Sequence, residues 1–174
     1  MLSSYFVFLK AMSGQDDVTV GVPLNSRSTF ESRKIAGMFV DNLIFRSRSS
    51  EGKTFLDLVK EVQEDFLYLF DNGNYDASSL TRSMGSVRDL SRNPLFDVMF
   101  VYQNSIMQGE SNKLCEYEVF DPGTAKYDFT LEVVEQKDSF ELYVEYNTSL
   151  FEPTTIEQFE SHFDTIVQLS LIHI

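Results

Sequence analysis

The chain has 174 residues, which is enough for one domain that buries a sizeable core without disulfides or metals. Its net charge of −13 disfavours binding to nucleic acid or to an anionic membrane, because both partners are negatively charged. The 16 phenylalanines argue against disorder, and the single cysteine, Cys115, excludes an internal disulfide, which fits a reducing compartment.

The first part of the chain predicts a helix and two strands. Apolar residues recur at three- and four-residue steps between Leu2 and Met12, which predicts an amphipathic helix that ends at Gly14. Residues 17–21 have the composition of a strand that leads to the turn residues Pro23, Asn25 and Ser26. Residues 39–46, rich in Val, Leu, Ile and Phe, predict a second strand.

The next expected helix follows Thr54. Thr54 and Asp57 have the spacing of a capping box at a helix start. An apolar stripe of period 3.6 comes after them and consists of Phe55, Leu58, Val59, Val62, Phe66 and Leu69. The polar, turn-rich residues 71–79 predict a loop.

The second half predicts several strands and a closing helix. Residues 95–103 are nearly all apolar and suit a strand buried on both faces. A loop at 105–113 and strands at 114–120, 127–135 and 139–147 follow, with a hairpin turn at 136–138. The last helix is expected to open near Pro153, with Thr154 and Glu157 as a second capping box. Its core stripe is Ile156, Phe159, Phe163, Ile166 and Val167.

Side chains that commonly carry catalysis are scarce. The two histidines, His162 and His173, belong to no cluster with zinc-ligand spacing, and the chain has no P-loop, GxGxxG or GxSxG motif. Cys115 stands beside Glu116 in a predicted strand, which disfavours a reactive thiolate. We therefore expect no catalytic residue and no metal site in these residues. The longest early apolar run, residues 5–9, is too short for a signal peptide or a membrane span, so a cytoplasmic protein is expected.

Three stretches combine a specific order with unusual local chemistry. They are residues 14–27 (GQDDVTVGVPLNSR), 35–46 (IAGMFVDNLIFR) and 88–104 (RDLSRNPLFDVMFVYQN). In order and spacing they resemble the C-terminal half of a condensation domain of nonribosomal peptide synthetases. The resemblance runs from residue 1 to residue 167, and the third stretch is the most specific of the three.

This resemblance implies both a fold and an activity. The fold is a chloramphenicol-acetyltransferase-like lobe of the α/β (α+β) class, a mixed sheet flanked by helices. The activity is amide formation between an aminoacyl or peptidyl thioester donor and an aminoacyl acceptor. Both are carried on the 4'-phosphopantetheine arms of peptidyl carrier protein domains, and no cofactor is bound directly. The other implied partners are the missing N-terminal lobe of the same domain and an adjacent adenylation domain.

The chain also departs from the family pattern. The usual Asn-Thr pair of the second stretch is Asp41-Asn42 here, and the usual Gly after Ile35 is displaced to Gly37. The usual His-Gln-Asp-Tyr-Pro-Phe-Glu segment is replaced by residues 72–78 (NGNYDAS), and the catalytic His-His-x-x-x-Asp-Gly signature is absent. We therefore expect residues 1–168 to be a truncated C-terminal lobe that is inactive alone. Residues 169–174 are expected to be a non-native tail, and Met1 need not be the native start.

The resemblance also assigns candidate site residues. Gly37, Met38, Asp41 and Asn42 would line the substrate tunnel, where Asp41 or Asn42 would hydrogen-bond the acceptor or the pantetheine amides. A plain strand start with a polar turn is the alternative interpretation of these residues. A structural role is preferred for the motif made of Arg88, Asp89, Ser91, Arg92, Asn93 and Pro94, in which Ser91 or Asn93 caps the loop before the strand.

Three functions stay open at this point. The first is the amide-forming condensation domain, within which a heterocyclisation subtype remains open. Epimerisation is disfavoured because residues 37–40 (GMFV) are condensation-like. The second is a non-catalytic module of the same fold that binds carrier proteins or acts as a scaffold. The third is an acyltransferase that uses coenzyme A esters. In the first case the surface that faces the missing lobe should be apolar.

Overall fold

The architecture is given by a computed structural model, which describes residues 1–27, 29–48, 52–73, 75, 77–83, 92–103 and 123–172. The predicted loop at 105–113, the predicted strand at 114–120, Cys115 and His173 lie outside the described residues. Residues 88–91 and 104 of the third stretch, which include the candidates Arg88, Asp89 and Ser91, also lie outside them.

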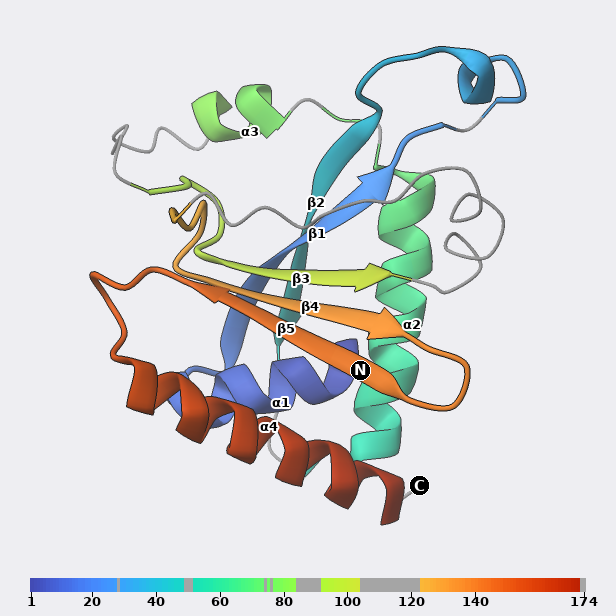
Figure 1. Cartoon of the computed structure of the whole chain (residues 1–174). Helices are drawn as coiled ribbons and strands as arrows, with labels where there is room; N and C mark the ends of the chain where they lie inside the picture. Colours follow the sequence, from blue (N-terminus) through green and yellow to red (C-terminus); the bar gives the residue numbers. More distant parts are fainter. Residues whose placement is uncertain are drawn as a thin grey trace.

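The described residues form one mixed five-stranded sheet (Figure 1). Its strands are β1 (Asp17–Asn25), β2 (Val40–Arg48), β3 (Val98–Gln103), β4 (Phe129–Glu135) and β5 (Phe140–Tyr146). Their order is β2-β1-β3-β4-β5, with parallel pairing of β1 with β3 and of β3 with β4, and antiparallel pairing at both outer pairs. The predicted hairpin turn between β4 and β5 is confirmed, because the Gln136 amide donates to the Ser139 carbonyl at 2.9 Å.

Two of the three predicted turn residues, Pro23 and Asn25, were wrong, because β1 continues to Asn25, whereas Ser26 does lie beyond the strand. The pairing of β1 gives the reason. Strand β3 pairs with β1 only at Val20 and Gly21, so among the described strands only β2 pairs with the second half of β1. Proline lacks an amide donor but is tolerated where a strand is an edge.

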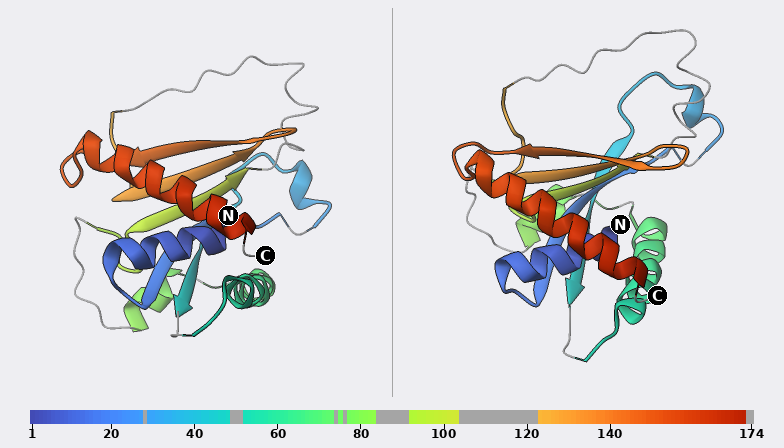
Figure 2. Two further views of the ribbon diagram at one scale, coloured as in Figure 1. Left: turned by 90° about the horizontal axis from the view of Figure 1, so that it is seen from below. Right: turned by 60° about the horizontal axis from the view of Figure 1, so that its bottom comes forward.

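Three helices cover one face of the sheet (Figure 2). They are α1 (Leu2–Ser13), α2 (Phe55–Asp71) and α4 (Pro153–Ile172). Helix α1 ends at Gly14 as predicted, with a φ of 68° that suits glycine. The capping box at the start of α2 is also confirmed: the Thr54 side chain accepts from the Asp57 amide, and Asp57 accepts from the Thr54 amide.

Two predictions, one about a helix start and one about a loop, were wrong. Helix α4 begins at Pro153, so Thr154 lies inside its first turn and cannot be the N-cap residue of a box with Glu157. The predicted loop at 71–79 contains the start of a short helix, α3 (Ala77–Ser83). Turn residues end α2 at Asn72, but no Gly or Pro occurs between residues 74 and 84, so the backbone can enter one further helical segment.

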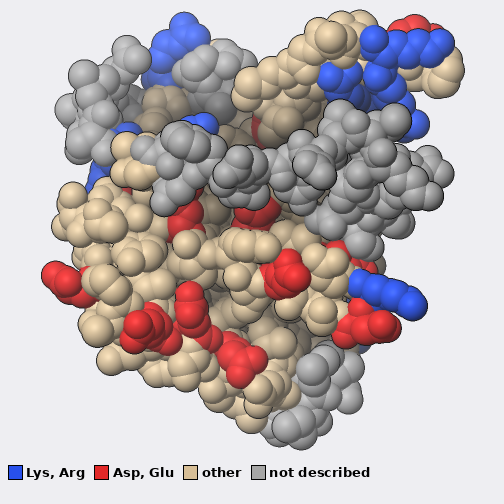
Figure 3. All heavy atoms as spheres, viewed as in Figure 1, with Lys and Arg blue, Asp and Glu red and all other residues tan. Residues whose placement is uncertain are grey.

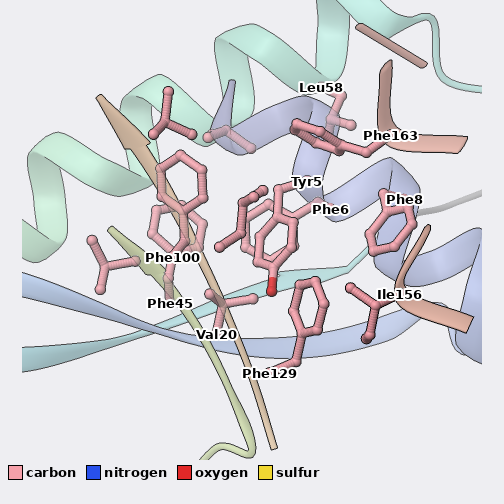
Figure 4. Packing of buried hydrophobic residues seen from close by; sticks show 14 residues of the cluster. Tyr5, Phe6, Phe8, Val20, Phe45, Leu58, Phe100, Phe129, Ile156 and Phe163 are labelled. Atoms are coloured by element: carbon pink, nitrogen blue, oxygen red, sulfur yellow. The ribbon is translucent and has the colours of Figure 1, made fainter. Parts of the chain in front are cut away.

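The core lies between the helices and the sheet, and Tyr5 of α1 is at its centre (Figure 4). The Tyr5 side chain is fully buried, and its ring lies 5.5 to 6.5 Å from those of Phe100, Phe129 and Phe163. Its hydroxyl donates to the Met99 carbonyl at 3.4 Å. Because burial raises the pKa of Tyr5 far above its usual value, this phenol stays protonated and neutral inside the core.

A smaller cluster lies on the opposite face of the sheet, called the outer face from here on. It consists of Phe96, Met99 and Tyr127, with Ile44, Leu95 and Val101 packed against it. Met99 and the following Phe100 are buried on opposite faces, which confirms two-sided burial for the first part of β3. The last part of the strand is exposed, since Tyr102 keeps 44% of its accessible surface.

Candidate functional site

The first two candidate tunnel residues, Gly37 and Met38, stand on a long connection between β1 and β2, called the β1–β2 loop (residues 26–39). It extends beyond the end of the sheet and carries a single 3₁₀ turn, Ser32–Lys34 (Figure 1). The amide and the hydroxyl of Ser26 both donate to the Phe39 carbonyl, at 2.8 and 3.0 Å. The two ends of the loop are therefore tied together where β1 stops and β2 begins.

Arg27 organises the interior of this loop. Its guanidinium donates to the carbonyls of Ser32, Ile35 (2.6 Å) and Gly37 (2.9 Å). The same group lies 4.1 Å from the centre of the Phe39 ring, which adds a cation–π contact. Three carbonyls of a loop that has little regular structure are thus satisfied by one side chain.

The β1–β2 loop exposes several large apolar side chains. Four side chains with large exposed fractions form what we call the loop-tip surface: Phe30 (67%), Ile35 (53%), Met38 (88%) and Val40 (49%). Figure 3 shows Lys and Arg side chains gathered at this end of the molecule, whereas Asp and Glu predominate over the strands and helices below. Exposed apolar surface rimmed by charge is typical of a place where another protein surface docks.

Neither the contacts nor the backbone conformation of Gly37 within the described residues requires glycine at this position. A Cβ placed there would have the Phe39 ring as its nearest neighbour, at 3.5 Å, which is an ordinary contact. Its backbone φ is also not in the left-handed region. The missing side chain at Gly37 leaves room for another backbone to approach closely.

Asp41 and Asn42, the next two candidates, point to opposite faces of the sheet. They stand in register with Leu24 and Pro23 of β1, and side chains alternate along a strand. The Asp41 side chain is exposed. The Asn42 amide is half-buried on the outer face, where its Nδ2 donates to the Tyr127 hydroxyl at 3.1 Å. The structure therefore brings the four candidates to one end of the sheet without converging them on one point.

Tyr127 is the residue that the sequence interpretation missed. It precedes β4, is only 8% exposed, and its ring lies 5.2 Å from that of Phe96. No local sequence pattern distinguishes Tyr127 from the other aromatic residues of the predicted strands. Its relation to Asn42 appears only when the sheet brings the two segments together.

Residues Arg92, Asn93 and Pro94 lie elsewhere, in a cleft of about 510 Å³. This cleft opens where β1 and β3 begin, whereas the tunnel candidates lie where β1 ends. The cap predicted for Asn93 is present, because its Oδ1 accepts from the Leu95 amide at 3.0 Å. This placement agrees with a role in shaping the start of β3.

Arg92, which lines that cleft, lies near two carboxylates. Its Nε is 3.8 Å from Asp97 and its Nη2 is 4.0 Å from Asp128. Burial and the neighbouring Asp97 raise the pKa of Asp128, and Arg92 opposes this shift. The pairs are long and exposed, so each contributes little to stability.

Within the described residues, no group of three His, Cys, Asp or Glu side chains could hold a metal ion. His162 is exposed on α4. Among the helices that the structure describes, none is long and apolar enough to cross a membrane.

Comparisons with known proteins agree with the fold. A family described as "Condensation domain" matches residues 1–173. The chain is 39% identical over 165 residues to gramicidin S synthase 2 of Brevibacillus brevis, which covers 94% of this chain and 4% of the relative. It is also 39% identical over 165 residues to surfactin synthase subunit 1 of Bacillus subtilis (strain 168), with 94% and 5% covered.

Solved structures have the same architecture. Holo-AB3403, a four-domain nonribosomal peptide synthetase, matches with a TM-score of 0.87 at 18% identity, over 99% of this chain and 14% of that one. The condensation domain of the monacolin K polyketide synthase MokA matches with a TM-score of 0.79 at 20% identity, over 99% and 41%. The predicted mixed sheet flanked by helices, of the chloramphenicol-acetyltransferase type, is thereby confirmed.

Proposed function

Because the chain belongs to the condensation-domain family, we propose that it is the C-terminal lobe of a domain that forms amide bonds in nonribosomal peptide synthesis. The observation that carries this proposal is the family match over residues 1–173. The chain spans only 4 to 5% of the curated relatives described above, so its parent protein would contain many further domains. A cytoplasmic location, predicted from the sequence, is part of the same proposal.

The reaction joins two tethered substrates. The acceptor amine nitrogen attacks the carbonyl carbon of the donor thioester, the carbon–sulfur bond breaks, and the thiol leaves with the proton lost by nitrogen. Donor and acceptor would arrive on the 4'-phosphopantetheine arms of two peptidyl carrier protein domains, and an adjacent adenylation domain would supply the activated amino acid. Holding both ends in one tunnel supplies a large part of the acceleration, because a bimolecular step becomes effectively unimolecular.

The loop-tip surface supports the presence of a second lobe. Its four apolar side chains keep about half or more of their surface exposed within the described residues, and Met38 is 88% exposed. A missing N-terminal lobe seated on this end would bury them and place Gly37 and Met38 on the wall of the tunnel. Such burial is favourable by about 25 cal/mol per Å² of apolar surface.

Asp41 or Asn42 would then face the acceptor side of the tunnel, since the two side chains point to opposite faces of the sheet. In place of the usual Asn, Asp41 brings a negative charge and no donor, which favours a cationic amine. Asn42 retains a side-chain amide that can accept or donate. Both residues stand at the start of β2, where the rigid sheet fixes their backbone.

The decisive experiment uses the complete parent protein. We expect a His-His-x-x-x-Asp-Gly signature in the residues that precede this lobe, and amide formation when both carriers are loaded. The isolated 174 residues should give no measurable condensation. Turnover by the isolated chain, or a parent without that signature, would contradict the proposal.

A non-catalytic carrier-binding module of the same fold is the second candidate, and the altered Asp41-Asn42 pair favours it. The same assay separates the two functions. Binding of loaded carriers without any amide product would select the scaffold. Product formed from a coenzyme A ester in place of a loaded donor carrier would select the third possibility, an acyltransferase.

A further inference from the structure

The departure from the family pattern at Asn42 comes with a specific partner. The Asn42 Nδ2 donates to the Tyr127 hydroxyl at 3.1 Å, although the two residues are 85 positions apart. Asn42 is on β2, and Tyr127 lies two residues before β4. Strands β1 and β3 lie between β2 and β4 in the sheet. The bond therefore reaches across the outer face of two intervening strands.

Packing explains how Tyr127 reaches so far. Gly21 of β1 has no side chain on the outer face, and a Cβ there would stand only 2.2 Å from Cε2 of Phe96. The Phe96 ring fills that space, and the Tyr127 ring packs on it with centroids 5.2 Å apart and planes inclined by 34°. Both rings are more than nine-tenths buried. The Tyr127 hydroxyl is thus held in place by packed neighbours.

This arrangement decides which atom of Asn42 remains available. A planar amide whose Nδ2 donates to Tyr127 keeps its Oδ1 as an acceptor on the other side of Cγ. An acceptor amine and the amides of a pantetheine arm both present N–H groups, which match an oxygen acceptor. The threonine usual at this position in the family has a hydroxyl one bond nearer to the backbone, so it could not make the same bond.

We propose that Tyr127 is a positioning residue that orients the Asn42 amide, so that Oδ1 accepts a hydrogen bond from an N–H group of the acceptor substrate. This inference rests on the proposed condensation function and deepens it. It assigns Asn42 to acceptor recognition, and it assigns to Tyr127 a role exerted through Asn42.

The test is a double-mutant cycle in the parent protein. Tyr127→Phe removes the hydroxyl and keeps the ring on Phe96, while Asn42→Thr restores the residue usual in the family. Tyr102→Phe is the matched control: it also removes a hydroxyl, one that donates to Glu135 at 2.8 Å, and β3 presents it on the helix-covered face. The measured quantities are kcat and KM for the loaded acceptor carrier, together with the thermal midpoint of each variant.

We expect Tyr127→Phe to raise the acceptor KM about fivefold with kcat within about twofold, which corresponds to one neutral hydrogen bond. In the Asn42→Thr background the same change should have no further effect, because the amide that it orients is gone. The control should match the wild type, and all thermal midpoints should stay close together.

Each other result overturns the inference in a recognisable way. If Asn42→Thr impairs the acceptor KM and Tyr127→Phe does not, Asn42 acts without Tyr127. If Tyr127→Phe is equally harmful in both backgrounds, its role is structural. If neither variant changes the kinetics, the pair has no part in acceptor recognition, while the condensation function stands. If the wild-type parent forms no amide from loaded carriers, the proposed function fails and this inference fails with it.

Discussion

Replacement of Gly21 by alanine should destabilise the protein, although alanine is usually the better strand residue. The added Cβ would lie 2.2, 2.6 and 2.6 Å from Cε2, Cδ2 and Cζ of Phe96. Carbon atoms in contact are normally about 3.5–4.0 Å apart, so the ring would have to move by roughly 1.5 Å. Phe96 is only 6% exposed and is packed on Tyr127, so it has little room to move.

The size of the effect follows from two opposing terms. Overpacking of a filled core costs about 1–3 kcal/mol. Replacing glycine in a strand also stabilises the fold by about 0.5–1 kcal/mol, because alanine has less conformational entropy to lose on folding. The midpoints of these two ranges differ by about 1 kcal/mol, so we expect Gly21→Ala to lower the free energy of unfolding by roughly that amount.

Urea unfolding of the parent's condensation domain measures this change as a lower midpoint at an unchanged slope. Gly37→Ala is the matched control, because its nearest contact would be 3.5 Å and its stability should be close to wild type. Phe96→Leu should compensate in part, so the double variant should lose less than the sum of the two single losses. A Gly21→Ala protein as stable as the wild type would refute the steric reasoning.

Three further predictions concern other contacts. Thr54→Ala removes the side chain that accepts from the Asp57 amide, and should cost about 1 kcal/mol in urea unfolding. Hydrogen bonding to Arg46 holds the pKa of Asp17 below its usual value. The resulting stabilisation is present above the unfolded-state pKa and disappears as pH falls through the folded-state pKa. Asp17→Asn should therefore reduce the loss of unfolding free energy at acidic pH, measured by unfolding followed by circular dichroism. Arg27→Ala frees three loop carbonyls, so limited proteolysis should cut the β1–β2 loop faster while the thermal midpoint hardly moves; unchanged cleavage would contradict the role given to Arg27.

Features that depend on neighbours a few residues apart could be predicted from the sequence. The stop of α1 at Gly14, the capping box at Thr54 and the turn between β4 and β5 all formed as expected, because each is decided by backbone and side-chain groups within one or two turns of chain. The ordered motifs likewise indicated the family, since they record residue types and spacing directly.

Features that depend on which strands become neighbours required the tertiary structure. Pro23 can lie inside β1 because the pairing of β3 with β1 ends at Gly21. The residues around Pro23 give no indication of where that pairing ends. The hydrogen bond between Asn42 and Tyr127 likewise exists only because the sheet order places β1 and β3 between them and Gly21 leaves room for Phe96. Side-chain chemistry was therefore readable from the sequence, whereas the partner of each side chain was decided by long-range strand pairing.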